Sequence, residues 1–399
     1  MLMTRRHFLQ GLGAIGLLAT LAPRMARAAG TRAQPLILIE LKGGNDGLNT
    51  VIPYREGGYL EARGELALTA NEVIELAKPD GTALGLHPAL APLAEAWAAG
   101  DLAWVLGLGY PNPNRSHFRS IEIWDTAEPD DIEASGWLDR LAEVARSYGV
   151  AFPSPLNGVI LAQGGDGPIA GAALPSVHLS DPDRFAQSGQ RLDPIDLSVT
   201  GGSLAHIIDT HNGVRQASDE LAAALDTVPD LASDFPDTDI GRQLAVAARL
   251  VIAGVDARAI KTGLGSFDTH ANQAGTHAGL LTQVGEAVMA LRAVLRDAGL
   301  WSQSLVMSYS EFGRRLAANG SLGTDHGTAA PHFVLGGRVN GGLFGRYPSL
   351  TDLDSQGDVR FTTDFRALYS TIAAQWWDVP GNHPWGDGFA PIGALIRPA

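Results

Sequence analysis

The stretch from Ser304 to Gly337 constrains the fold most, because it places a charged loop between two apolar segments. Leu305 to Tyr309 has the composition of a buried strand, and His332 to Leu335 that of a second, short strand. In open α/β sheets, ligands bind where loops leave the carboxyl ends of strands. The loop is therefore a candidate site, although a solvated surface loop would explain it equally well. Its charged residues are Glu311, Arg314, Arg315, Asp325 and His326.

Apolar segments alternate with helical patterns along the rest of the chain. Strands are predicted at 35–41, 102–108 and 258–262, and helices at 90–99, 240–255 and 278–298. This βαβ order predicts an α/β fold with a mostly parallel central sheet. Residues 150 to about 235 are rich in Gly, Pro, Ser and Asp, and we expect them to form a capping insertion over the sheet.

Residues 1–28 have the features of a twin-arginine signal peptide. Arg5 and Arg6 precede an apolar segment, Gly11 to Leu21, and Ala26 to Ala28 form an A-x-A cleavage site. The apolar segment is too short for a stable transmembrane helix, so we expect no membrane anchor in the mature form, residues 29–399. These features predict a partner, the twin-arginine export machinery, and a periplasmic or secreted location.

Composition narrows the chemistry that this chain can perform. Its 399 residues carry a formal net charge of −14, which argues against a nucleic-acid partner because such a partner requires a basic face. The chain contains no cysteine, so it has neither disulfides nor thiolate ligands. We therefore expect any divalent metal ion to be Zn, Mn, Mg or Ca, held by Asp, Glu, His or Asn.

Two motifs follow strands in the first part of the chain. Asp46 lies in the segment GGNDG after the strand at 35–41, either as a ligand or as part of an ordinary turn. Ser116 follows Arg115 and a Pro-rich turn, at the predicted start of a helix. Because backbone N–H groups at a helix N-terminus attract anions, Ser116 is a candidate nucleophile, and a plain helix cap is the alternative. His117, on the same turn, is the rival nucleophile.

A third motif, Asp268 and His270, follows the strand at 258–262. Residues two apart in an extended segment point the same way, so this pair makes half a metal site. Since loops that follow parallel strands gather at one edge of the sheet, we expect all these motifs to meet there. So many carboxylates close together need cations, and two divalent ions would provide them.

Six segments, taken together and in this order, resemble the exported bacterial family called domain of unknown function 1501. They are GGNDGLNTVIPY, GLHPAL, PNPNRSHF, FDTHANQ, SEFGRR and TDHG. That family is similar in fold to the alkaline phosphatase and sulfatase superfamily. The resemblance implies a three-layer α/β/α sandwich with a two-metal site.

The resemblance also implies roles for individual residues. Ser116 would be the nucleophile, with Arg115 or Arg314 steadying the anion. The chain departs from the superfamily pattern where Phe312 replaces a usual histidine, and where Asp268 and His270 are unusually close in sequence. The metal ligands would be Asp46, Asp268, His270, Glu311, Asp325 and His326.

These observations predict an exported, metal-dependent hydrolase of phosphate or sulfate esters, with one or two divalent ions. Its substrate would be a small-molecule or polysaccharide ester. The alternative is a non-catalytic protein on the same fold that binds metal or associates with polysaccharide. A metal assay distinguishes them, because two equivalents of bound metal favour the enzyme and none favours the binding protein.

Overall fold

The computed structural model describes residues 34–77, 81–196, 201–379, 381 and 383–399. The predicted signal peptide, residues 1–28, lies outside this range. Gln34 to Ala399 form one compact unit. Its main element is a nine-stranded sheet in the order β11-β5-β10-β9-β1-β8-β6-β7, with β12 also paired to β5.

The centre of the sheet is parallel. β1 (Leu36–Leu41) pairs in parallel with both β8 (Ala259–Leu264) and β9 (Leu305–Tyr309). β10 (Ala330–Gly336) runs antiparallel to β9 and to its other neighbour, β5 (Leu102–Gly109). The remaining strands are β6 (Gly158–Ile160), β7 (Ser176–His178), β11 (Gly342–Phe344) and β12 (Thr363–Asp364).

The side chains of β1 point alternately to the two faces of the sheet, which explains why helices cover both faces. All six of its residues are buried, and successive side chains point to opposite faces. Ile37 and Ile39 belong to one apolar cluster, whereas Leu36 and Leu38 belong to another. The strand therefore supplies two cores, which requires a layer of helices on each side.

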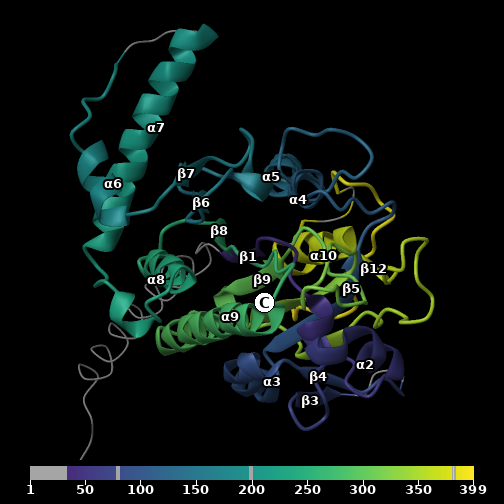
Figure 1. The fold of residues 1–399 in the computed structure, drawn as a ribbon. Helices are drawn as coiled ribbons and strands as arrows, with labels where there is room; N and C mark the ends of the chain where they lie inside the picture. Colours follow the sequence, from purple (N-terminus) through teal and green to yellow (C-terminus); the bar gives the residue numbers. More distant parts are fainter. Residues whose placement is uncertain (1–33, 78–80, 197–200, 380, 382) are drawn as a thin grey trace, which may run out of the picture. The chain divides into compact units, whose positions relative to one another are not determined.

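The helices fall into two groups that match these cores (Figure 1). On the Ile37 face lie α3 (Ala94–Ala99), α8 (Asp239–Ile252) and α9 (Gln273–Asp297). On the Leu36 face lie α4 (His117–Thr126), α5 (Trp137–Ser147) and α10 (Phe365–Thr371). The predicted α/β sandwich with a mostly parallel central sheet is confirmed.

Among the described helices, α9 is the one whose length and apolar composition would allow it to cross a membrane. Its apolar residues Leu280, Val284, Val288 and Leu291 pack into the core on the Ile37 face. The same composition is therefore explained by burial against the sheet.

Residues 150–235, which we predicted as a capping insertion over the sheet, contribute two strands to the sheet itself. β6 pairs with β8, and β7 pairs with β6, both in parallel. The helical part of this region is α6 (Pro182–Gly189) packed against α7 (Gly202–Leu225). Short strands were missed here because runs of three residues have too little periodicity to be recognised.

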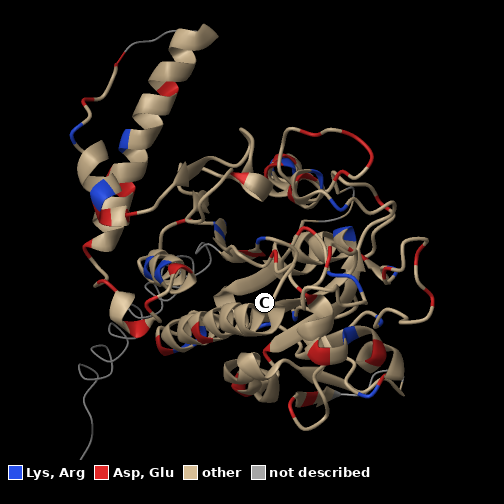
Figure 2. Cartoon of the chain, viewed as in Figure 1, with Lys and Arg blue, Asp and Glu red and all other residues tan. Residues whose placement is uncertain are grey.

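A smaller sheet contains β2 (Val51–Ile52), β3 (Ile74–Ala77) and β4 (Leu84–Leu86). Between β2 and β3 the chain forms the short helix α2 (Gly57–Arg63), which ends on a fully buried arginine, Arg63. Figure 2 shows that charged residues lie mainly on helices and loops, while the strands of the main sheet carry few. A buried charge such as Arg63 therefore requires a specific partner.

The two-core arrangement predicts the cost of truncating a β1 side chain. Ile37 has no exposed surface, so Ile37→Ala should lower the free energy of unfolding by about 2–5 kcal/mol, through lost burial and a cavity. Ile132, which is 90% exposed, provides the matched control, and Ile132→Ala should change stability by less than about 0.5 kcal/mol. Urea unfolding measures both. Equal effects of the two substitutions would contradict the assignment of Ile37 to a packed core.

Candidate metal centre

The carboxyl ends of the parallel strands bring the predicted motifs to one edge of the sheet. The loop after β5 leads to His117, the loop after β8 carries Asp268 and His270, and Glu311 is the second residue of the loop after β9. His326 lies just before the antiparallel strand β10, whose amino end is at the same edge. Segments far apart in the sequence therefore supply one group of side chains.

His117, Asp268 and His326 form the centre of this group. One side-chain atom from each lies within 4.8 Å of the others, the spacing expected of metal ligands. Asp268 Oδ2 is 3.3 Å from His117 Nε2, and Asp268 Oδ1 is 3.0 Å from His326 Nε2. His270 joins them, because its Nε2 lies 3.0 Å from both Asp268 Oδ1 and His326 Nε2.

The other ring nitrogen of each histidine faces a hydrogen-bond acceptor. His117 Nδ1 is 2.6 Å from Glu311 Oε1, and His270 Nδ1 is 3.1 Å from Asp325 Oδ1. His326 Nδ1 is 2.8 Å from the carbonyl oxygen of Arg115, which can only accept. Each Nδ1 therefore carries a proton and donates it outward, which leaves Nε2 with a lone pair directed at Asp268 in the neutral ring.

This arrangement fits a cation. Three Nε2 lone pairs and a carboxylate would repel one another, unless a proton or a metal ion lies between them. Ligands about 2.0–2.1 Å from a tetrahedral zinc ion are roughly 3.3 Å apart, close to the separations found here. The outward hydrogen bonds to Glu311, Asp325 and a backbone carbonyl are the contacts that commonly orient metal-binding histidines.

Asp268 is held as a carboxylate. Burial raises its pKa, but other contributions, of which the hydrogen bond from Arg314 is the largest, lower it to about 2. Arg314 is itself buried, and its nitrogens donate to backbone carbonyls of four residues as well as to Asp268. The structure thus places Arg314 behind Asp268 as a support, with its donors engaged, rather than facing a substrate. The four carbonyls belong to Gly43, Gly44, Phe267 and Thr324.

Glu311 and Asp325 lie one layer outside the centre. Glu311 is buried and accepts hydrogen bonds from the Gly43 N–H as well as from His117. The pKa of Glu311, which burial would raise, is lowered by the hydrogen bond from His117. Asp325 accepts from Asn319 and His270. Both carboxylates, predicted as ligands, orient imidazoles in this structure.

Asp46 is separated from the centre by its own partners. Its carboxylate is fully buried and receives two hydrogen bonds from the Arg63 guanidinium and one from Gln273. Burial would raise the pKa of Asp46, but the charge of Arg63 lowers it to about 2. The arginine thus supplies the positive charge that we predicted a metal ion would supply. Arg63 has no motif of its own in the sequence, so only the fold reveals this pairing.

Ser116 and Arg115 occupy the turn before α4. Ser116 is the exposed N-cap residue of α4, and its side chain makes no capping hydrogen bond. The guanidinium of Arg115 points to Asp354 and Asp358, with which it forms ion pairs. Its contribution to the centre is the carbonyl oxygen that orients His326.

His117 is the residue that sequence reasoning assigned differently, as a rival nucleophile and not as a metal ligand. It is the first residue of α4, next to Ser116. A signal was present in the sequence, because His117 follows the same Pro-rich turn after a strand as Ser116 does. Its place beside Asp268 depends on β5 and β8 lying in one sheet, which the local sequence does not reveal.

A groove of about 680 Å³ opens beside the centre. Arg115 and Phe312 line it, and the Phe312 ring contacts the rings of both His117 and His326. Its other lining residues are rich in amide and aromatic side chains, among them Tyr110, Asn112, Asn114, Gln356 and Phe361. The groove therefore connects the candidate centre to a surface suited to hydroxyl-bearing ligands.

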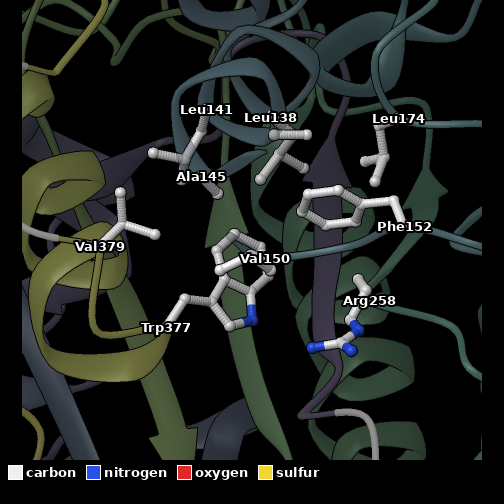
Figure 3. Close-up of a pocket in the computed structure, with 10 residues that line it drawn as sticks. Leu138, Leu141, Ala145, Val150, Phe152, Leu174, Arg258, Trp377 and Val379 are labelled. Carbon is white, nitrogen blue, oxygen red and sulfur yellow. The ribbon is translucent and has the colours of Figure 1, made fainter. Parts of the chain in front are cut away.

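A second pocket is apolar and small (Figure 3). Leu141 and Leu138 of α5, Phe152 and Trp377 line its volume of about 50 Å³. Its charged residue, Arg258, forms an ion pair with Asp256. The pocket contains no carboxylate or imidazole, so it offers no metal ligands.

Comparison with known proteins gives a family match of limited extent. The family described as "Protein of unknown function (DUF1501)" matches residues 211–383, a range that contains Asp268, Glu311 and His326. This match supports the resemblance to that family. No curated protein matches the chain.

Several solved structures are similar at low sequence identity. The crystal structure of Ps i-CgsB has a TM-score of 0.40 and 11% identity, and the match covers 90% of this chain and 75% of the Ps i-CgsB chain. PsFucS1 sulfatase from Pseudoalteromonas sp. has a TM-score of 0.37 and 11% identity, with 94% and 74% covered. The lipoteichoic acid synthase LtaP from Listeria monocytogenes has a TM-score of 0.35 and 10% identity, with 78% and 68% covered. Likeness at this level carries no inference about activity.

The buried pair of Asp46 and Arg63 predicts a pH-dependent loss of stability. Asp46→Asn leaves the Arg63 charge buried and unpaired, so at pH 7 it should cost about 3–5 kcal/mol. The folded pKa of Asp46, about 2, lies below the ordinary value of 3.8. The stabilisation is therefore complete above pH 3.8 and is lost as the pH falls towards 2, so the gap between wild type and variant should narrow there.

Chemical unfolding at several pH values measures this gap. Asp352→Asn is the control, because Asp352 forms an ion pair with Arg360 at the surface and should contribute less than about 1 kcal/mol. An Asp46→Asn protein as stable as wild type at pH 7 would show that the pair is not the buried contact described here.

Proposed function

We propose that the protein is a metal-dependent hydrolase of phosphate or sulfate esters, with a single divalent ion held by His117, Asp268, His270 and His326. The observation that carries this proposal is the convergence of three Nε2 atoms on one carboxylate, each imidazole being fixed by an acceptor at Nδ1. Imidazole-rich sites favour zinc over magnesium or calcium, which take oxygen ligands.

The proposal of one ion, rather than two, rests on Asp46. In a two-metal site this carboxylate would be free to bind the second ion. Here Arg63 and Gln273 already satisfy it in a fully buried position. Replacing an ion pair of this kind with a hydrated metal ion would leave the Arg63 charge buried without a partner, which is costly.

A bound divalent ion would polarise a phosphoryl or sulfuryl oxygen and stabilise the charge that develops during ester cleavage. The chain's own residues then bind and orient the ester. Asp268 and His270 are 44% and 43% exposed at the side chain, so the proposed site opens to solvent on their side. The amide and aromatic groups of the adjacent groove would hold the alcohol part, whether a small molecule or a saccharide.

Ser116 remains our proposed nucleophile. It is exposed, it precedes His117 at the N-terminus of α4, and its side chain makes no capping bond that would hold it elsewhere. His117 would be engaged as a ligand and is no longer a rival in this proposal. We also propose that residues 1–28 direct the protein through twin-arginine export to the periplasm or the outside.

Metal binding is the first test of the proposed function. The wild-type protein should retain about one equivalent of zinc after dialysis, and Asp268→Ala and His326→Ala should abolish that binding. Glu311→Gln should weaken it about 10–100-fold, because Glu311 only orients His117. Elemental analysis and calorimetric titration measure stoichiometry and affinity. His206→Ala, an exposed histidine of α7, is the control and should bind like wild type. A folded wild-type protein that takes up no divalent ion would overturn the proposal.

Turnover of aryl phosphates and aryl sulfates by the metal-loaded protein is the second test. Ser116→Ala should lower kcat by at least about 10³-fold if the serine attacks, and should leave zinc stoichiometry unchanged. The two readouts separate a lost nucleophile from a lost ion. A Ser116→Ala protein that hydrolyses the ester at the wild-type rate would instead support attack by water.

A further inference from the structure

Four neighbouring strands place a row of polar side chains inside the sandwich, beneath α4. Glu40 of β1 lies opposite Tyr309 of β9, and Lys261 of β8 lies opposite Leu38, two residues before Glu40 on the same face. β10 and β9 are antiparallel, and Val334 lies opposite Met307. Two residues further along this pairing, His332 of β10 lies beside Tyr309. The row therefore runs Lys261, Glu40, Tyr309, His332 across the sheet.

Helix α4 closes this row from above. The Trp124 ring lies edge-on to the His332 ring, with centroids 5.3 Å apart. Asp125 and Lys261 lie close together on the same side of Gly167, since a Cβ atom added there would lie 2.5 Å from Lys261 Nζ and 3.0 Å from Asp125 Oδ1. We call these six residues the polar row: Glu40, Trp124, Asp125, Lys261, Tyr309 and His332.

Within the described residues, five members of the polar row have buried polar atoms without a hydrogen-bond partner. They are Glu40 Oε2, Trp124 Nε1, Asp125 Oδ1, the Tyr309 hydroxyl and both ring nitrogens of His332. Glu40 forms ion pairs with Lys42 and Lys261 at 3.5 Å and 3.3 Å, but these contacts lack hydrogen-bond geometry at Oε2. Native proteins leave few buried polar atoms unpaired, so this many in one layer indicates a bound species.

The chemistry of the unpaired atoms identifies that species. A metal ion requires acceptors only, and an anion requires donors only. The polar row offers both, because the Trp124 N–H and the Tyr309 hydroxyl donate, whereas Glu40 accepts. A neutral His332 offers one of each. Water is the ligand that matches a mixed set of donors and acceptors, and buried waters typically make two to four such bonds.

The protonation states agree with this assignment. Burial lowers the pKa of His332 to about 3, so its ring is neutral. Burial also raises the pKa of Asp125 to about 8, so that carboxyl group is largely protonated at neutral pH and both donates and accepts. Buried Lys261 offsets the charge of Glu40, whereas Lys42, the second partner of Glu40, is partly exposed to solvent.

We propose that the polar row holds an internal cluster of ordered water molecules, one layer behind the candidate metal centre. Tyr309 is followed two residues later by Glu311, and α4 carries both Asp125 and His117. The same two elements thus connect the water cluster to the residues that orient and form the centre. The cluster is inferred from the polar row alone and does not require that the protein be a hydrolase.

The direction in which Tyr309→Phe changes the Tm tests the proposal. In a dry layer the Tyr309 hydroxyl is a buried group without a partner, so Tyr309→Phe would leave Tm unchanged or raise it. In a hydrated layer the hydroxyl bonds to water, and we expect Tyr309→Phe to lower Tm by about 1–2 °C. Tyr369→Phe is the matched control, because the Tyr369 hydroxyl donates directly to the Trp124 carbonyl at 2.7 Å and its loss lowers Tm in either case.

A crystal structure of the wild-type protein at high resolution provides the second measurement. Ordered water in contact with Tyr309 and His332, together with a lower Tm in Tyr309→Phe, would support the proposal. A layer without water, or an unchanged or raised Tm in Tyr309→Phe while Tyr369→Phe is destabilised, would overturn it.

Discussion

The buried guanidinium of Arg314 holds the loops of the candidate centre together. It donates to the carbonyls of Gly43 and Gly44 after β1, of Phe267 after β8 and of Thr324 before β10, and also to the Asp268 carboxylate. A lysine could not reproduce these contacts, because its single ammonium lacks the planar fork of five donors. Three loops that come from different strands are therefore fixed relative to one another by one side chain.

This support explains how a group of exposed polar side chains keeps a definite geometry. Asp268 and His270 are almost half exposed, and exposed side chains normally sample several rotamers. His270 is oriented by Asp325, and the other three side chains of the centre each contact a buried side chain or a backbone carbonyl. Arg314 fixes Asp268, buried Glu311 fixes His117, and a backbone carbonyl fixes His326. Ordering the side chains in advance lowers the entropy that binding an ion would otherwise cost.

Charge in this molecule is arranged in layers. Asp46 and Arg63 form a closed pair in the interior, where neither can be protonated or deprotonated without a large cost. The imidazoles and Asp268 lie nearer the surface, and the polar row lies below α4. Asp46 and Arg63 satisfy their charges as an ion pair. Our proposals assign a bound cation to the imidazoles and Asp268, and ordered water to the polar row.

The sequence by itself determined the fold class and most of the residues that meet at the edge of the sheet where the candidate centre lies. The β1, β5, β8 and β9 segments are runs of buried, mainly apolar residues, and a polar motif follows each of them. Parallel strands bring such motifs to one edge, so Asp268, His270 and His326 could be grouped before any coordinates. The tertiary structure decided which carboxylates face inward and which orient their neighbours. Asp46 carries as strong a sequence motif as Asp268, but Arg63, which comes from a short helix with no recognisable motif, neutralises it. Hydrogen-bond partners of this kind depend on contacts between distant segments, and a pattern read along the chain contains no information about them.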